Sequence, residues 1–301
     1  AKDKDGRFIR QTSSFRNWIT GDGQAGTTGV GGFKAEKDRY HLYVAYICPW
    51  ASRALMVRSL KRLSDYITVS VVNPVLSEQG WQFGGFAGAD QDTLNGHQYL
   101  HQLYSNSDPH FTGRATVPVL WDKKKQTIVN NESADIIRML NSAFDHLTGS
   151  TLDLYPAAKR AEIDQQNADI YNQLNNGVYK AGFASSQLAY EEAYHDVFAM
   201  LDKLEKQLSD GRSYLMGDLL TETDIRTFVT LIRFDAAYYG LFKCSRYLIA
   251  QKANLSAYVK RILALPGIEK TVNIQHIKSG YYSIKALNPS GIVPVGPEKI
   301  V

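Results

Sequence analysis

The spacing of apolar residues divides the chain into two halves. In the first 150 residues, short apolar runs typical of buried strands are separated by polar turns and by one helical stretch. Beyond Tyr155-Pro156 the strand signals mostly vanish, and apolar residues recur every three or four positions, as at Val197, Leu201, Leu204 and Leu208. The pattern predicts an α/β domain followed by an all-helical domain (α/β plus all-α).

The first half begins with three elements in close succession. Residues 42–47 form an apolar run that predicts a buried strand, and residues 49–63 follow a helical pattern. Residues 67–72 predict a second strand, which ends at Asn73-Pro74. Residues 74–110 carry scattered aromatics without a clear period and are predicted to form a long loop. A loop of this length in a compact domain is usually functional or mobile.

A hairpin and a helix complete this half. Residues 115–122 predict a strand that contains Pro118, residues 122–125 predict a tight turn, and residues 126–129 predict a second strand. A helix is then expected, with Glu132 and Ser133 in its first turn. The order strand, helix, strand, loop, hairpin and helix is that of a thioredoxin-like domain.

The predicted domain boundaries follow these changes of pattern. Residues 1–40 are polar and rich in glycine, and they are predicted to form an extended arm. Residues 41–150 form the thioredoxin-like domain, and residues 151–301 form the helical domain with a C-terminal tail. Within the helical part, Thr221 and Asp224 have nearly the pattern of a capping box, and Pro266-Gly267 is a helix stop signal.

Composition narrows the function classes. The net charge of +4 is mild for 301 residues and is spread along the chain, which argues against nucleic acid or anionic membranes as partners. No apolar run reaches the roughly 18 residues that cross a bilayer, and no secretory signal is expected. The two cysteines, Cys48 and Cys244, make no disulfide framework and suit a reducing compartment, so a cytoplasmic location is predicted. Cys244 is expected to be an inert buried thiol, and no metal site is predicted.

Cys48 stands where the first predicted strand meets the first predicted helix. With Cys48 at the N-cap and Pro49 at the first helical position, backbone N–H groups and the positive helix end face the sulfur. Such a position lowers a cysteine pKa from about 8.5 to roughly 3.5–7.5 and makes the thiolate a nucleophile. Ala51 stands where a dithiol oxidoreductase has its second cysteine. A mixed disulfide on Cys48 must therefore be reduced by a thiol from another molecule, and glutathione is the obvious candidate.

Two further features are typical of a site for a peptide-like ligand. Pro118 interrupts a strand, where a cis Val117–Pro118 bond would turn backbone groups toward a ligand. Glu132-Ser133 begins a helix, whose N–H groups suit a carboxylate.

Together these motifs resemble a cytosolic glutathione transferase of the cysteine type, and more narrowly the Xi class, the glutathionyl-hydroquinone reductases. The resemblance spans nearly the whole chain. The broader match rests on Cys48-Pro49-Trp50-Ala51, Thr116-Val117-Pro118-Val119, Asn131-Glu132-Ser133 and Thr221 to Asp224. The narrower match rests on FRNWI (15–19), GWQF (80–83), RFDAAYYGLFKC (233–244) and the tail from His276 to Pro297.

The resemblance implies a thioredoxin-like glutathione-binding domain, an all-helical substrate domain and a role for each matching residue. Cys48 is then the nucleophile, and Tyr179 exchanges a proton with the substrate. Tyr238 and Tyr281 hydrogen-bond the thiolate and lower its pKa. Glutathione is held by Trp81, Arg114, Val117, Glu132 and Ser133. Adjacent side chains cannot point the same way, so Tyr239 and Tyr282 remain alternatives to Tyr238 and Tyr281.

The implied reaction removes glutathione from a glutathionyl-hydroquinone and leaves a mixed disulfide on Cys48, which a second glutathione reduces. The implied partners are glutathione and aromatic glutathione conjugates, with a second copy of the chain in a homodimer. Ser52, Gly280 and Ile284 depart from the family, which has histidine after the Cys-Pro-Trp-Ala run and near the Tyr281 pair.

Other readings remain open. An Omega-like thiol transferase or dehydroascorbate reductase would share the cysteine and the glutathione site but need no tyrosine trio. A non-catalytic glutathione-fold protein would bind aromatic ligands or partners. A transferase that conjugates glutathione is less favoured, because it stabilises the glutathione thiolate with a serine or tyrosine hydroxyl.

Overall fold

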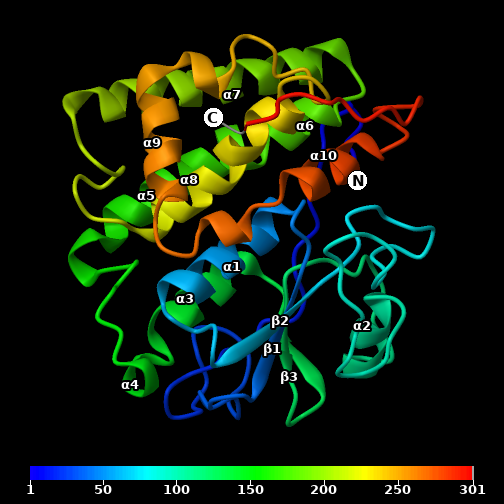
Figure 1. Cartoon of the computed structure of the whole chain (residues 1–301), viewed down its shortest axis with the longest axis vertical. Helices are drawn as coiled ribbons and strands as arrows, with labels where there is room; N and C mark the ends of the chain where they lie inside the picture. The colour runs from blue at the N-terminus through cyan, green and yellow to red at the C-terminus, as the bar shows by residue number, and fades with distance from the viewer. Residues whose placement is uncertain (300–301) are drawn as a thin grey trace. The chain divides into compact units, whose positions relative to one another are not determined.

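A computed structural model describes residues 1–299, which divide into two compact units (Figure 1). The sheet unit comprises Ser13–Asp153 and Pro266–His276. The helical unit comprises Ala1–Thr12, Leu154–Leu265 and the chain from Ile277 on. The residues of the predicted arm are thus shared between the two units.

The sheet unit contains a four-stranded sheet in the order β2-β1-β3-β4. The strands are β1 (Tyr40–Val44), β2 (Ile67–Val71), β3 (Val119–Asp122) and β4 (Thr127–Asn130). β1 runs parallel to β2 and antiparallel to β3, which pairs antiparallel with β4. All of β1 is buried, as expected for a central strand covered on both faces. The predicted thioredoxin-like order is confirmed, with its fold class.

Strand β2 ends one residue before the predicted end, and two other strand boundaries differ by three or more residues. β1 ends at Val44 rather than 47, because residues 45–48 make a turn in which Cys48 N–H donates to the Ala45 carbonyl over 3.1 Å. β3 begins at Val119 rather than 115, since Pro118 has no N–H to give to a ladder. The Val117–Pro118 bond is cis, as predicted.

Helices α1 (Pro49–Leu60) and α3 (Ser133–Ser142) pack against each other beside the sheet (Figure 1). A short helix, α4 (Asp145–Thr148), follows α3. Helix α1 ends before the predicted residue 63, because Arg62 adopts a left-handed conformation with φ 57°. The first eight residues of α1 except Trp50 are buried or nearly so, so this helix carries Cys48 on a rigid base.

The predicted loop at 74–110 is wrong in one part, because α2 (His101–Ser107) lies within it. This short helix has no side-chain N-cap and few good helix formers, so local pattern gives little sign of it. Burial holds it: Leu103 and Tyr104 are fully enclosed, and the Ser107 hydroxyl accepts from Ile128 N–H of β4 over 2.8 Å.

The helical unit contains helices and short helical turns, and no strand occurs in it among the described residues. The helices are α5 (Arg160–Ile170), α6 (Gly177–Gly182), α7 (Gln187–Gln207), α8 (Glu222–Arg233), α9 (Ala253–Leu263) and α10 (Ile274–Tyr282), whose first residues belong to the sheet unit. Two π-helical segments, η2 (Tyr171–Asn175) and η4 (Phe234–Tyr238), continue α5 and α8. The remaining turns, all 3-10, are η1 (Ala157–Lys159), η3 (Leu208–Asp210), η5 (Ile249–Gln251) and η6 (Glu269–Thr271), the last in the sheet unit.

The predicted capping box forms at the start of α8. Thr221 is the N-cap, and the Asp224 carboxylate accepts from Thr221 N–H over 2.9 Å and from Leu215 N–H over 3.0 Å. Tyr258 of α9 donates its hydroxyl to the same carboxylate over 2.7 Å. Asp224 is fully buried, and this burial raises its pKa to about 6 despite the three donors. The box therefore joins α8 to α9 through a buried acid.

Within the described residues, 1–299, no helix is both long and apolar enough to span a membrane. The same residues contain no cluster of histidine, cysteine and acidic side chains arranged to hold a metal ion.

Candidate functional site

Cys48 lies at the N-cap of α1 in the sheet unit, as the strand–Cys–Pro–helix pattern predicts. Its backbone is extended, with φ −78° and ψ 118°, and Pro49 takes the first helical position. Ala51 N–H donates to Sγ over 3.5 Å, and the thiol approaches the Val117 carbonyl over 3.6 Å. The side chain is partly exposed. A hydrogen-bond donor and a helix start therefore favour the thiolate at a place that a ligand can reach.

The second cysteine has the opposite environment. Cys244 is fully buried, and this burial raises the pKa of its thiol to about 12. The prediction of an inert buried thiol agrees with this position. The chain thus offers one thiol suited to nucleophilic chemistry.

A buried cation lies near the start of α3. Arg53 of α1 is 2% exposed, and its Nη1 donates to the Ser133 hydroxyl over 3.4 Å. Its guanidinium lies 4.7 Å from the ring centre of Trp50. Since Ser133 is the first residue of α3, a positive helix end and a cation meet at this point. Both favour an anionic ligand group, such as a carboxylate.

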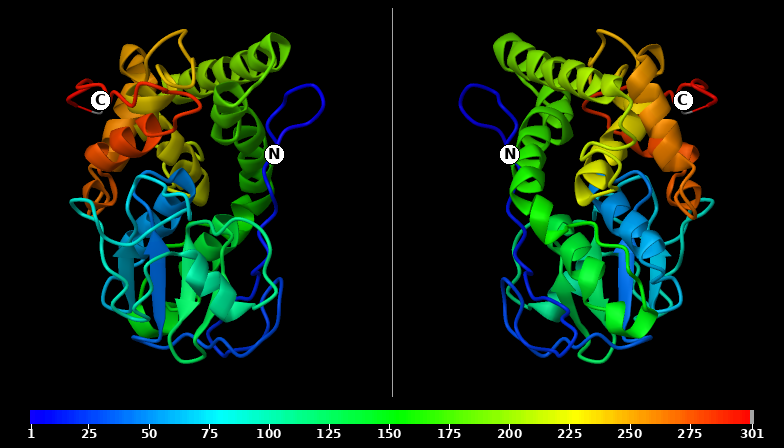
Figure 2. Two further views of the ribbon diagram at one scale, coloured as in Figure 1. Left: turned by 90° about the vertical axis from the view of Figure 1, so that its right-hand side faces the viewer. Right: turned by 90° about the vertical axis from the view of Figure 1, so that its left-hand side faces the viewer.

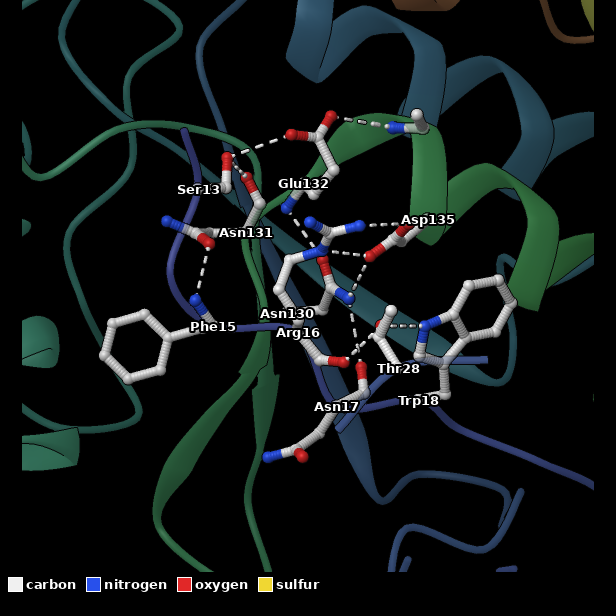
Figure 3. Close-up of polar contacts among 11 residues, drawn as sticks. Ser13, Phe15, Arg16, Asn17, Trp18, Thr28, Asn130, Asn131, Glu132 and Asp135 are labelled. Carbon is white, nitrogen blue, oxygen red and sulfur yellow. Dashed lines mark hydrogen bonds and ion pairs between the residues drawn. The ribbon is translucent and has the colours of Figure 1, made fainter. Parts of the chain in front are cut away.

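Glu132 is the N-cap of the same helix, and Figure 3 shows its contacts. Oε1 accepts from Ala134 N–H over 3.3 Å, and the backbone N–H of Glu132 donates to Asn130 Oδ1 over 2.7 Å. Oε2 accepts from the hydroxyl of Ser13 over 3.1 Å (Figure 3). The carboxylate is partly exposed, so it can also accept from an ammonium group of a ligand.

Three tyrosines converge in the helical unit, although they come from distant parts of the chain. The Tyr281 hydroxyl lies 2.6 Å from the hydroxyl of Tyr179 and 2.6 Å from that of Tyr238. Of the adjacent pairs Tyr238/Tyr239 and Tyr281/Tyr282, the structure thus selects Tyr238 and Tyr281 for this hydrogen-bonded group. We call these three residues the tyrosine chain. Tyr238 ends the π-helical segment η4, and such segments are frequent at functional sites.

The tyrosine chain is buried at one end and open at the other. Tyr238 is 0% exposed and Tyr281 is 3% exposed, whereas Tyr179 is partly exposed. Burial raises the pKa of Tyr238 and of Tyr281 well above the usual phenol value, so both stay protonated at neutral pH.

Two hydrogen bonds use two of the three phenol protons. The arrangement that leaves neither buried proton without an acceptor runs from Tyr238 to Tyr281 to Tyr179. The Tyr179 oxygen then accepts within the tyrosine chain, and the proton of Tyr179 is not used inside the chain.

An aromatic wall surrounds the tyrosine chain. The rings of Phe8, Phe183 and Phe242 pack against Tyr179 with centroid distances of 6.4, 6.3 and 5.4 Å. The Arg10 guanidinium lies 4.9 Å from the ring centre of Tyr179, and its Nε donates to Asn176 Oδ1 over 3.0 Å. A cation within about 6 Å of a ring centre is attracted to the ring face, so Arg10 packs on the partly exposed end of the tyrosine chain.

The other predicted glutathione residues all lie in the sheet unit. Val117 has its carbonyl at the Cys48 sulfur. Trp81 is partly exposed, and its carbonyl accepts from Leu100 N–H over 2.9 Å. Arg114 is exposed in the loop between α2 and β3. The structure thus brings Cys48 and Val117 together directly and puts Glu132 and Ser133 side by side at one helix start.

Sequence reasoning missed Arg53, Ser13 and Arg10. A signal existed for Arg53, because a charged residue in the mostly apolar run 51–57 is unusual unless it is paired. Ser13 and Arg10 lie in a polar stretch without period, where no local signal distinguishes them from their neighbours.

Comparison with known proteins gives two family models that match this chain. The glutathione S-transferase N-terminal domain model matches residues 47–143, and the glutathione S-transferase C-terminal domain model matches residues 187–261. The first range contains Cys48, Glu132 and Ser133, and the second contains Tyr238.

Similar whole proteins extend the match over nearly the whole chain. Glutathionyl-hydroquinone reductase YqjG of Escherichia coli is 54% identical over 98% of this chain and 90% of its own length. A glutathione-bound structure of that protein superposes with a TM-score of 0.93, covering 95% of this chain and 93% of that one. Glutathionyl-hydroquinone reductase PcpF of Sphingobium chlorophenolicum is 48% identical over 98% of this chain and 91% of its own length. The glutathione S-transferase Xi of Phanerochaete chrysosporium is 48% identical, with a TM-score of 0.92 over 98% of this chain and 99% of that one.

Proposed function

Because this chain belongs to the glutathione S-transferase family, within its Xi class of glutathionyl-hydroquinone reductases, we propose that Cys48 and Tyr179 carry the removal of glutathione from glutathionyl-hydroquinones. Glutathione is the cosubstrate. The observation that carries the residue assignment is the partly exposed Cys48 at a helix N-cap, with Ala51 N–H donating to its sulfur.

The first step forms a sulfur–sulfur bond and breaks a carbon–sulfur bond. The Cys48 thiolate attacks the sulfur that joins glutathione to the aromatic ring. The electron pair of the carbon–sulfur bond goes to the ring carbon, which takes a proton from Tyr179. Cys48 is left as a mixed disulfide with glutathione, and the hydroquinone leaves. The ring carbon is a poor leaving group unless it is protonated, which is the physical reason for an acid.

The second step restores the enzyme. A second glutathione attacks the mixed disulfide as its thiolate, releases Cys48 as a thiolate and leaves as oxidised glutathione. The proton of that glutathione returns to Tyr179. The sum is one glutathionyl-hydroquinone and one glutathione converted to one hydroquinone and one oxidised glutathione, with every proton and electron pair accounted for.

The glutathione moiety carries one ammonium group and two carboxylate groups, and each needs a partner of opposite charge or a hydrogen-bond partner. We propose that Ser133 and the start of α3 take the α-carboxylate of the γ-glutamyl end, with Arg53 behind them. Glu132 takes the neighbouring α-ammonium. The backbone of Val117 pairs with the cysteinyl part, Trp81 lies against the tripeptide and Arg114 supplies a further positive charge. Tyr238 and Tyr281 act through Tyr179: their hydrogen bonds hold the Tyr179 hydroxyl in place.

The experiment is a turnover assay with a glutathionylated hydroquinone and glutathione, in which hydroquinone release is followed. Cys48→Ser is expected to abolish turnover, whereas Cys244→Ala, the matched control at the buried thiol, keeps it. Tyr179→Phe is expected to lower hydroquinone release by about 100-fold or more, the contribution of a general acid. Simple disulfide exchange, which needs no ring protonation, should stay largely intact in Tyr179→Phe.

The same variants separate the alternatives. Equal losses of both activities in Tyr179→Phe would remove the acid role and favour an Omega-like thiol transferase. Full activity in Cys48→Ser would overturn the assignment of Cys48 as the nucleophile. Binding of glutathione without turnover of any thiol substrate would favour a non-catalytic binding protein.

We further propose that the chain acts on aromatic glutathione conjugates in the cytoplasm as a homodimer. A reducing compartment keeps Cys48 available as a thiol and supplies glutathione. The aromatic wall around Tyr179 supports an aromatic ligand group. Sedimentation velocity of the purified chain tests the dimer, since a single species of monomer mass would contradict it.

A further inference from the structure

The N-terminal arm adds a segment to the edge of the sheet. Asn17 N–H donates to the Val129 carbonyl over 3.0 Å, and Asn131 N–H donates to the Phe15 carbonyl over 3.1 Å. Arg16 and Asn130 form the antiparallel bridge between them. The arm therefore pairs with β4, which would otherwise be an open edge strand (Figure 2). Strand β4 leads through Asn131 directly to Glu132.

Two side-chain contacts fasten this segment to the first turn of α3 (Figure 3). Arg16 donates from Nε and Nη2 to the two carboxylate oxygens of Asp135, over 2.5 and 3.0 Å. Asn130, which is 0% exposed, donates to Asp135 over 3.1 Å and to the Asn17 carbonyl over 3.0 Å. A bidentate ion pair with a buried amide beside it fixes the arm against the helix start.

Ser13 is the arm residue that reaches Glu132. Its hydroxyl lies 3.1 Å from Glu132 Oε2 and 3.4 Å from the Asn131 carbonyl. A hydroxyl has one proton, and the shorter contact to a charged acceptor is the stronger one. Since Ala134 N–H holds the other carboxylate oxygen, both oxygens of Glu132 are held. A carboxylate has about four acceptor positions, so two remain for a ligand.

We propose that Ser13 is a positioning residue of the glutathione site: it holds the Glu132 carboxylate in the orientation that receives the α-ammonium of the γ-glutamyl end. This inference rests on the proposed function, which assigns that ammonium to Glu132. It gives the glycine-rich arm a role in ligand affinity, because pairing with β4 and the Arg16–Asp135 ion pair bring Ser13 to the carboxylate. Ser13 touches Glu132 rather than the reacting sulfur, so it affects binding rather than chemistry.

The experiment measures ligand binding to the full chain by isothermal titration calorimetry. S-methylglutathione is the first probe, since its blocked thiol cannot react with Cys48. The second probe is S-methylglutathione without the α-amino group, which has nothing to offer Glu132. For Ser13→Ala we expect an approximately five- to tenfold higher Kd for the first probe, the loss of one hydrogen bond to a charged group. The Kd of the second probe should change by less than twofold.

Three controls make the result specific. Ser14→Ala removes the neighbouring, exposed hydroxyl and should leave both Kd values unchanged. Ser13→Thr keeps a hydroxyl and should restore the affinity for the first probe. Glu132→Gln should weaken the first probe more than the second, and this variant tests the proposed function independently of Ser13.

Each result decides the question. If Ser13→Ala raises the Kd of both probes equally, Ser13 has a general structural role and the inference is overturned. An unchanged Kd for both probes would overturn it as well. If Glu132→Gln discriminates between the probes and Ser13→Ala does not, the Glu132 assignment stands and the role of Ser13 falls. If Glu132→Gln affects both probes equally, the assignment of the ammonium to Glu132 falls, and the role of Ser13 with it.

Discussion

Replacing Tyr281 by phenylalanine removes the oxygen at the centre of the tyrosine chain and leaves the ring in place. Two hydrogen bonds of 2.6 Å are lost, one to Tyr179 and one to Tyr238. The Tyr238 hydroxyl is fully buried, so weakening its hydrogen bonding costs about 1–3 kcal/mol. Tyr179 is partly exposed and can bond to water instead, so the loss of its hydrogen bond to Tyr281 adds about 1 kcal/mol at most.

We therefore expect Tyr281→Phe to lower the free energy of unfolding of the helical unit by about 2–3 kcal/mol. Tyr238→Phe removes one hydrogen bond and its own buried hydroxyl together, and should cost about 1 kcal/mol. Tyr282→Phe is the matched control, because it deletes the hydroxyl of the adjacent, partly exposed tyrosine. Its cost should stay within about 0.5 kcal/mol.

The assay is urea unfolding followed by far-ultraviolet circular dichroism, which reports helix content. Tryptophan fluorescence alone would not suffice, because all four tryptophans lie in the sheet unit. Hydrogen exchange of the amides in α10 localises the effect to the helix that carries Tyr281. Equal costs for Tyr281→Phe and Tyr282→Phe would refute the central position of Tyr281, as would a larger cost for Tyr238→Phe than for Tyr281→Phe.

Two further predictions concern titrating groups. Burial raises the pKa of Asp224 to about 6 from an ordinary value of 3.8, so the folded state holds a proton that the unfolded state releases in this window. The free energy of unfolding should therefore fall by about 3 kcal/mol as pH rises from about 4 to about 6, and stay level above pH 6. The measurement is the difference in unfolding free energy between wild type and Asp224→Asn at each pH. A difference that does not change with pH would contradict this prediction. In the native protein, iodoacetamide should label Cys48 with a midpoint well below 8.5 and leave Cys244, whose pKa burial raises to about 12, unlabelled up to pH 9. Peptide mass spectrometry identifies which cysteine is labelled. Labelling of Cys244 before Cys48 would show that the reactive thiol is misassigned.

The local parts of the site follow from residues that are neighbours in sequence. The apolar run, cysteine and proline at 42–49 predict a strand, a cap and a helix start, because each of these preferences acts within a few residues. The same holds for Glu132-Ser133 at the start of α3 and for Thr221 and Asp224 at the start of α8. These local features predict the fold class, which the structure confirms, and a reactive thiol at Cys48, which stays a prediction.

The boundaries and the irregular parts depend on contacts between distant residues. Helix α2 forms in a stretch of weak helix formers because Leu103 and Tyr104 are buried and Ser107 bonds β4. Its stability comes from packing, which a local pattern does not contain.

No local pattern marks the tyrosine chain, whose three residues were named only by the family resemblance, and none marks the contact between Ser13 and Glu132. Tyr179 and Tyr281 are 102 residues apart, and Ser13 and Glu132 are 119 apart, yet each pair is joined by a hydrogen bond. With 18 tyrosines in the chain, no periodicity marks the three that meet. Sequence alone determined which chemistry the chain can carry at Cys48, since that depends on adjacent residues. Folding decided which phenols share protons and which serine holds Glu132, because hydrogen bonds require atoms to meet within about 3 Å in space.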